Sequence, residues 1–173
     1  VSIPTLDGAL ARIMEPRAAA PERRLRTIER LARAGVPVGI SVSPLIPFIN
    51  EPGLERVLER SRNAGASSAF ATPLRLPWEV KPLFQQWLAQ HFPQRAVRVM
   101  ARVRDMRGGR DNDPRFGHRM TGQGVWGELM RQRFAQATRR LGLRTERLAL
   151  DITQFRRPAA AEPAAASGQA SLF

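Results

Sequence analysis

A buried β-strand is predicted by the segment Val36-Pro-Val-Gly-Ile-Ser-Val-Ser-Pro-Leu-Ile-Pro47, in which apolar residues alternate with small ones. The apolar residues mark a face that packs against helices: Val36, Val38, Ile40 and Val42. The small residues on the other face leave room for a ligand beside the backbone: Gly39, Ser41 and Ser43. Pro44 and Pro47 are then expected to stop the pairing, because neither proline donates a backbone hydrogen bond.

Two further segments, residues 1–4 and 67–76, have a strand pattern. Helical patterns over residues 21–34 and 50–65 separate each strand from the next, and Asn50 is predicted to cap the second helix. Strands that alternate with helices predict parallel strands joined by right-handed crossovers. The predicted fold class is therefore α/β, either a piece of a barrel or an open doubly wound sheet.

The patterns divide the chain into three regions. Residues 1–76 carry the alternating strands and helices, and residues 77–142 form a helical extension interrupted by the Gly- and Arg-rich loop 107–124. Residues 143–173 have a linker composition and are expected to form a flexible, disordered tail. Because three strands cannot close a barrel, we expect the chain to be the C-terminal part of a longer protein.

The chain is strongly basic, with a formal net charge of +13 from 28 basic and 15 acidic residues. Such an excess indicates either contact with nucleic acid, DNA in particular, or arginines spread over solvated helix faces. The loop 107–124 is likewise either a nucleic-acid contact, with Phe116 stacking on bases, or a solvated connector. Its candidate nucleic-acid residues are Arg107, Arg110, Arg115 and Arg119.

The sequence contains no cysteine, which excludes disulfides and thiolate metal sites within these residues. The two histidines, His91 and His118, lie too far apart in sequence to form a recognisable metal site. No apolar run is long enough to cross a membrane and no secretory signal is found, so we expect a cytoplasmic location and no membrane partner.

A series of motifs occurs in order along residues 2–141: Ser2-Ile-Pro-Thr-Leu-Asp, Glu15-Pro-Arg-Ala-Ala-Ala-Pro-Glu-Arg-Arg, Gly35-Val-Pro-Val-Gly-Ile-Ser-Val-Ser-Pro-Leu-Ile-Pro, Arg75-Leu-Pro, Glu79-Val-Lys-Pro-Leu-Phe and Met106-Arg-Gly-Gly. In these motifs the chain resembles the C-terminal half of radical S-adenosylmethionine (SAM) proteins of the spore photoproduct lyase-like group.

The resemblance implies a partial TIM-like barrel in which SAM binds at the C-terminal ends of the strands. It also implies a 4Fe-4S cluster held by three cysteines of a CxxxCxxC loop. Reductive cleavage of SAM gives a 5′-deoxyadenosyl radical that abstracts a hydrogen atom from the substrate. Because this sequence has no cysteine, the cluster ligands are expected upstream, and the fragment alone is expected to be inactive.

Residues at the predicted strand ends are the candidate contacts to this cofactor. They are Ser2, Thr5, Glu15, Arg17, Ser41, Ser43 and Arg75. The resemblance implies that Ser2 contacts the amino-acid or ribose part of SAM and that Ser43 borders the adenine or ribose. Glu15 and Arg17 either clamp a carboxylate or form a loop ion pair. Ser41 and Ser43 are alternatively small residues that barrel packing tolerates.

The chain ends in Gln169-Ala-Ser-Leu-Phe173, which resembles the sliding-clamp-binding pentapeptide of bacteria, Gln-Leu-Ser/Asp-Leu-Phe. Ala170 departs from the favoured leucine. In such a peptide Leu172 and Phe173 fill an apolar pocket and Gln169 hydrogen-bonds at its rim; the alternative is a frayed terminus.

Two functions are therefore predicted. One is a radical SAM iron–sulfur enzyme acting on DNA. The other is a non-catalytic, basic nucleic-acid-binding module that the C-terminal peptide recruits to the sliding clamp.

Overall fold

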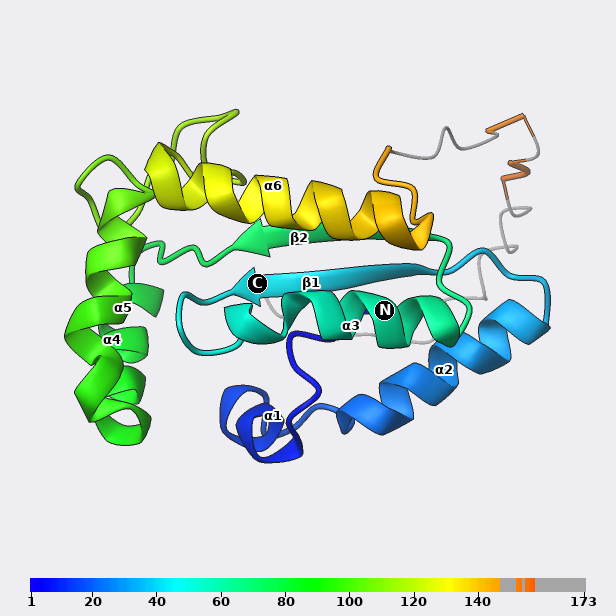
Figure 1. The fold of residues 1–173 in the computed structure, drawn as a ribbon, viewed down its shortest axis with the longest axis horizontal. Coiled ribbons are helices and arrows are strands. Elements are labelled where there is room, and N and C mark those ends of the chain that lie inside the picture. Colours follow the sequence, from blue (N-terminus) through cyan, green and yellow to red (C-terminus); the bar gives the residue numbers. More distant parts are fainter. Residues whose placement is uncertain (147–151, 154, 158–173) are drawn as a thin grey trace, which may run out of the picture.

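The computed structural model describes residues 1–146, 152, 153 and 155–157. Helices and strands alternate along this part of the chain (Figure 1). In order they are α1 (Gly8–Met14), α2 (Pro21–Arg33), β1 (Gly39–Leu45), η1 (Glu51–Gly53), α3 (Leu54–Asn63), β2 (Ser68–Pro73), α4 (Val80–His91), α5 (Pro93–Asp105) and α6 (Gly124–Leu141). The two helices predicted over residues 21–34 and 50–65 are confirmed, the second as the short 3-10 turn η1 followed by α3.

The strand β1 lies in the middle of a parallel array. It pairs with β2 on one side, and on its other side Ser41 forms a single parallel bridge with Ser2. Beyond β2, Ser68 forms a single parallel bridge with Arg144. The segments around Ser2, β1, β2 and Arg144 thus lie side by side in the order of the sequence, and all run in the same direction. The predicted α/β class with parallel strands is thereby confirmed.

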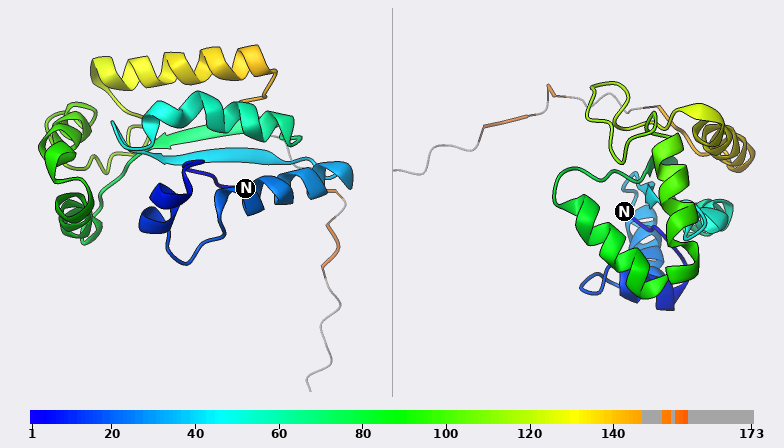
Figure 2. Two further views of the ribbon diagram at one scale, coloured as in Figure 1. Left: turned by 60° about the horizontal axis from the view of Figure 1, so that its bottom comes forward. Right: turned by 90° about the vertical axis from the view of Figure 1, so that its left-hand side faces the viewer.

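One face of the sheet packs against helices. Ile40 and Val42 of β1 are fully buried, and they share a core with apolar residues of α2, α3 and α6: Leu25, Ile28, Leu54, Val57, Leu58 and Ala137. The helix α3 contacts β1 directly and lies beneath α6 (Figure 2). Each large aliphatic side chain buried in this way contributes about 1.5–3 kcal/mol of transfer free energy. The alternation in the sequence thus identified the packed face correctly.

The opposite face of the sheet is uncovered by the described residues. Ser41, Ser68 and Thr72 line an open hollow of about 620 Å³ on this side, and the ring of Phe70 is 55% exposed. Parallel sheets in known folds are usually covered on both faces. The face made of small residues therefore remains accessible to a ligand or to further polypeptide.

Three predicted boundaries are wrong. Pro44 does not end the strand, because β1 continues to Leu45, which pairs with Pro73. Val36, predicted on the buried face, is 45% exposed, because it follows the turn at residues 34–35 and the strand begins only at Gly39. The predicted tail also begins too early. Leu143 is buried, and Arg144 exchanges backbone hydrogen bonds with Ser67 and Ala69, so these residues belong to the sheet.

The helices α4 and α5 form a hairpin beyond the C-terminal ends of β1 and β2 (Figure 1). Leu88 of α4 and Val99 and Val103 of α5 are fully buried, together with Ile46 and Leu74 from the segments that follow the strands. This second core fixes the hairpin to the end of the sheet. None of the helices in residues 1–146 is long and apolar enough to span a membrane.

An ion-pair cluster fastens α6 to the segment η1–α3. The guanidinium of Arg133 contacts the carboxylate of Glu51 and donates to both oxygens of Glu55 at 2.8 Å. The hydrogen bond from Arg133 is the main reason that the pKa of Glu55 is lowered from its ordinary value of 4.5.

Replacing Glu55 with glutamine should make the stability of the protein less sensitive to acid. Because the folded-state pKa lies below the unfolded-state value of 4.5, the contribution of Glu55 is complete above that pH and is lost as the pH falls through the folded-state pKa. Between neutral pH and about pH 3, the free energy of unfolding in urea should fall by about 0.5–1 kcal/mol less in Glu55→Gln, since the pair is partly exposed. The control is Glu59→Gln on the exposed face of α3. Equal acid sensitivity of Glu55→Gln and the unmutated protein would contradict this role.

Candidate functional site at the carboxyl edge of the sheet

The parallel direction of the strands brings their C-terminal ends to one edge, here called the carboxyl edge. Ser2 lies opposite Ser41, and Ser43 follows two residues further along β1. Ser41 lies on the open face and pairs with Phe70 of β2, whereas the hydroxyl of Ser43, which lies where the pairing becomes irregular, is buried. Three predicted site residues, Ser2, Ser41 and Ser43, are thus neighbours. Ligands of parallel α/β proteins bind at this edge.

Thr5, by contrast, is used to build a turn. Its side chain is buried, and its hydroxyl accepts a hydrogen bond from the backbone N–H of Asp7 at 3.1 Å. Asp7 in turn caps α1 by accepting from the N–H groups of Ala9 and Leu10. Thr5 therefore stabilises the turn that leads from the bridge residue Ser2 into α1.

Glu15 pairs with Arg24 and not with Arg17. Arg24 is buried and donates to Glu15 at 2.7 Å, to the carbonyl of Ala19 at 2.7 Å and to the carbonyl of Ser2 at 2.8 Å. The predicted ion pair between Glu15 and Arg17 is wrong, and Arg17 is exposed. Sequence reasoning missed Arg24, although it lies four residues before the buried Ile28 on the apolar face of α2.

Asn50 connects two strand ends. It was predicted to cap the following helix, but it makes no side-chain capping bond. Instead the buried amide donates to the carbonyls of Pro4 and Pro44, each at 2.8 Å, and accepts from the N–H of Ile46 at 2.7 Å. The cap prediction was therefore wrong. Asn50 instead joins the N-terminal segment, at Pro4, to the end of β1, at Pro44. A buried asparagine within an apolar segment was the signal for this role.

Arg107 departs most from the sequence prediction. It was a candidate nucleic-acid contact, but only 2% of it is exposed. Its guanidinium donates to five backbone carbonyls, those of Pro73, Leu74, His118, Arg119 and Thr121. Burial, and then the nearby charge of Arg75, lower its pKa. Arg107 therefore ties the loop to the end of β2, and almost none of its surface is left for a nucleic acid. Its signal was a position four residues after the buried Val103.

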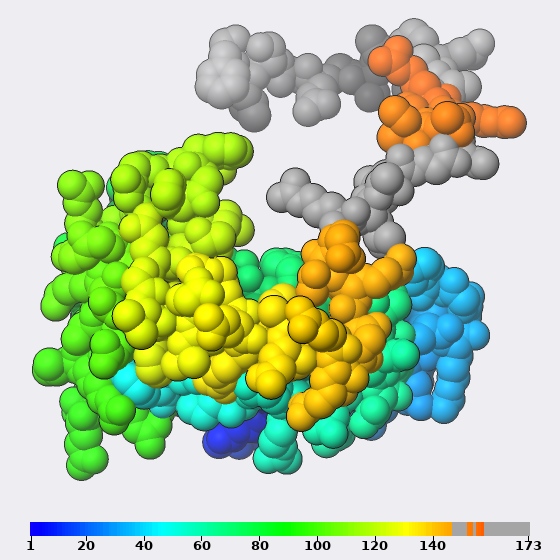
Figure 3. Space-filling view, turned by 45° about the horizontal axis from the view of Figure 1, so that its top comes forward, coloured from blue at the N-terminus to red at the C-terminus, as the bar shows by residue number. Residues whose placement is uncertain are grey.

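The other loop arginines lie toward the surface, in the part of the chain that stands beside the start of α6 (Figure 3). Arg115 donates to both carboxylate oxygens of Asp113, and this guanidinium holds the pKa of Asp113 far below its usual range. Arg119 lies 5.3 Å from the centre of the Phe116 ring. Arg110 is exposed. Loop 107–124 is thus fixed at its base and exposed at its outer part.

Three polar atoms near the carboxyl edge have no hydrogen-bond partner within the described residues. They are the hydroxyl oxygen of Ser43, Nε of Arg75 and Nε of Arg107, and all three are buried. The outer nitrogen of Arg75 reaches the sulfur of Met120 at 3.5 Å. Buried polar atoms are normally satisfied. The described residues alone therefore leave these polar atoms without a partner.

An apolar groove of about 330 Å³ adjoins this edge. It runs between α1, the end of β1 and α4, and its lining residues are Met14, Glu15, Pro44, Ile46, Leu74, Val80, Leu83, Phe84 and Trp87. Trp87 is fixed by a hydrogen bond from its indole N–H to the carbonyl of Ile13 at 2.9 Å. The groove is suited to a planar or apolar group whose polar atoms reach the carboxyl edge.

No group of histidine, cysteine and acidic side chains that could hold a metal ion is found among residues 1–146, 152, 153 and 155–157. The whole sequence lacks cysteine, so it offers no thiolate ligand for an iron–sulfur cluster. Gln169, Leu172 and Phe173 lie outside the described residues, and the clamp-peptide interpretation stays a prediction.

The chain is similar to uncharacterized proteins of much greater length. It is 43% identical over 79 residues to protein ORF301 of Acidianus two-tailed virus, a match covering 43% of this chain and 26% of that protein. It is 29% identical over 108 residues to Rv2578c of Mycobacterium tuberculosis and to Mb2609c of Mycobacterium bovis, covering 61% of this chain and 31% of each. The chain thus matches less than a third of these relatives. No family model and no solved structure matches it.

Replacing Asn50 with alanine should destabilise the protein by about 1–3 kcal/mol, because two strand-end carbonyls and the N–H of Ile46 lose their partner in the interior. The free energy of unfolding in urea measures this loss. Asn63→Ala, at the exposed end of α3, is the matched control and should change stability by less than about 0.5 kcal/mol. Equal stability of the two variants would show that Asn50 does not connect the strand ends.

Proposed function

We propose that this chain forms the C-terminal part of a radical SAM barrel and supplies the SAM-binding surface at its carboxyl edge. The observation that carries the proposal is the pair of unsatisfied buried groups, Ser43 Oγ and Arg75 Nε, at the ends of neighbouring parallel strands. The order of the strand positions, with helices on one face and an open face of small residues, supports a slice of a barrel. The greater length of the relatives leaves room for its other strands.

In this proposal, different residues of the carboxyl edge bind different parts of SAM. The guanidinium of Arg75 binds the carboxylate of the methionine part, because a guanidinium matches the two oxygens of a carboxylate. The hydroxyls of Ser2, Ser41 and Ser43 hydrogen-bond to the ribose and the amino-acid part. The apolar groove receives the adenine and excludes water from it. Glu15, neutralised by Arg24, borders this groove, whereas Arg17 is exposed and does not line it.

The cluster ligands have to come from outside these residues, since the sequence contains no cysteine. When bound, a 4Fe-4S cluster supplies the electron for the reductive cleavage of SAM. The described residues hold SAM, orient it and shield it. In this proposal the substrate is DNA, in a repair-like reaction that begins with the abstraction of a hydrogen atom.

The first test is the reading frame ahead of residue 1. A CxxxCxxC loop there supports the enzyme, and a frame without one contradicts it. In the anaerobically reconstituted protein encoded by that frame, Arg75→Ala should raise the KM for SAM by about tenfold or more, because a charged hydrogen bond is lost. The formation of 5′-deoxyadenosine measures the effect. Arg26→Ala, on the exposed face of α2, is the control and should leave the KM unchanged.

The second candidate function is a non-catalytic, nucleic-acid-binding module recruited to the sliding clamp. The net charge of +13 and the terminal segment Gln169-Ala-Ser-Leu-Phe173 favour it. Deleting residues 169–173 should abolish recovery of the protein on immobilised sliding clamp, since Leu172 and Phe173 are the anchors of the peptide. The control is deletion of residues 159–163, which shortens the tail and keeps the peptide. Unchanged recovery after loss of residues 169–173 would eliminate clamp recruitment.

A further inference from the structure

Loop 107–124 has a base that the interior of the protein holds in place. Arg107 joins the carbonyls of Pro73 and Leu74 to those of three loop residues. The N–H of Gln123 donates to the carbonyl of Met106 at 3.0 Å, and Arg131 of α6 donates to the carbonyl of Gly122. Both ends of the loop are therefore fixed to the end of β2 and to neighbouring helices. The loop holds its outer part in a constant place beside the carboxyl edge.

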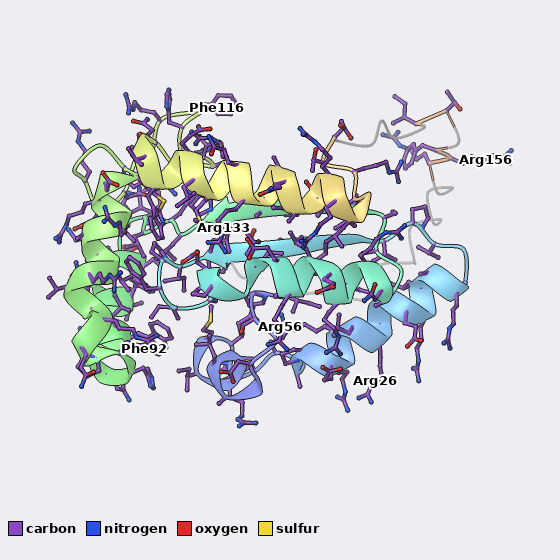
Figure 4. The ribbon with its side chains drawn as sticks, viewed as in Figure 1. Arg26, Arg56, Phe92, Phe116, Arg133 and Arg156 are labelled. Carbon is purple, nitrogen blue, oxygen red and sulfur yellow. The ribbon has the colours of Figure 1, made fainter. Side chains whose placement is uncertain are left out.

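The outer part presents an aromatic ring among arginines. Phe116 is 87% exposed, and Figure 4 shows its ring pointing away from the body of the protein. The guanidinium of Arg119 lies 5.3 Å from the ring centre, and Arg110 is exposed without an acidic partner in the described part of the chain. Arg115 is neutralised by Asp113. Phe116 belongs to neither of the two hydrophobic cores. Packing within the protein therefore gives no reason for an aromatic ring at this position.

We propose that Phe116, Arg110 and Arg119 form a docking surface for single-stranded nucleic acid. Phe116 stacks on a base, which every base permits because each has a π face, and the two guanidinium groups contact the phosphates. An acidic protein would use the arginines but would gain little from the exposed ring. The inference names the substrate class that the carboxyl edge would act on, and in that respect it rests on the proposed function.

The position of the surface relative to the carboxyl edge follows from two contacts. Met120 of the loop lies 3.5 Å from Arg75, and Leu74 accepts from Arg107 at 2.7 Å. A single-stranded nucleic acid whose base stacks on Phe116 is therefore held beside the ends of β1 and β2. This arrangement lets the loop retain a nucleic-acid chain while one nucleotide reaches the open edge.

A second basic surface on α2 serves as a matched control. Arg23, Arg26 and Arg30 lie along one exposed side of the helix, and none forms an ion pair within the described residues. Figure 4 shows Arg26 pointing away from the body. The helix carries no aromatic residue. It therefore offers the same charge as the loop without a stacking partner.

The test is binding of the complete chain to a fluorescein-labelled oligodeoxythymidylate of about twelve nucleotides, followed by fluorescence anisotropy. Phe116→Ala should weaken binding by about fivefold or more, the cost of losing one stacked base. The double variant Arg110→Glu/Arg119→Glu should weaken it by a larger factor and reduce its salt dependence. Arg23→Glu/Arg30→Glu, with the same change of charge on α2, should stay within about twofold of the unmutated protein. Circular dichroism checks that each variant is folded.

Four outcomes would overturn the proposal. They are no binding of the oligonucleotide, equal loss in the α2 and loop variants, no effect of Phe116→Ala, and equal competition by polyglutamate, which would indicate an acidic protein partner. The result is independent of the radical chemistry, because binding requires neither SAM nor a cluster. A chain that binds the oligonucleotide through Phe116 while the longer protein fails to cleave SAM would support the docking surface and contradict the enzyme.

Discussion

Backbone carbonyls at the ends of parallel strands need hydrogen-bond donors, and this need organises the structure. The pairing of β1 with β2 is irregular between Val42 and Leu45 and ends at the pair Leu45–Pro73, so the carbonyls of Pro44 and Pro73 need donors from elsewhere. Asn50 donates to Pro4 and Pro44, and Arg107 donates to Pro73 and Leu74. Each donor comes from a segment outside the sheet. The same bonds that satisfy the strand ends therefore attach the surrounding segments to the sheet and give the carboxyl edge its shape.

The use of a guanidinium for this purpose makes the edge electropositive. Burying a charge costs free energy unless it is well hydrogen-bonded, and Arg107 has five carbonyl acceptors but no carboxylate within ion-pair distance in the described chain. Arg75 lies close enough to affect its pKa. Two arginines beside the strand ends favour a ligand with a carboxylate or a phosphate. This property agrees with both proposals, SAM at the edge and nucleic acid at the loop, without depending on either.

The sequence predicts those parts of the fold that arise from local periodicity. The alternation through Val38, Ile40 and Val42 identified the central strand and its packed face, and apolar spacing located the helices that cover it. Val36 continues the alternation but precedes the strand, which begins only at Gly39, after the turn that ends α2. The candidate site was harder to predict. Asn50 and Arg107 bond to carbonyls 46 and 33 residues away, and no local pattern shows which carbonyls will be left without partners. A polar residue in register with a buried apolar stripe was the only sequence signal of these roles.

The base of loop 107–124 is bonded to the interior of the protein, whereas its outer part is exposed. Its base is committed to the interior through backbone atoms of His118, Arg119 and Thr121, while the side chains around Phe116 support nothing else in the protein. Residues 114–116, which are exposed, can thus be exchanged, or a fluorophore or crosslinker attached there, with little disturbance to the sheet.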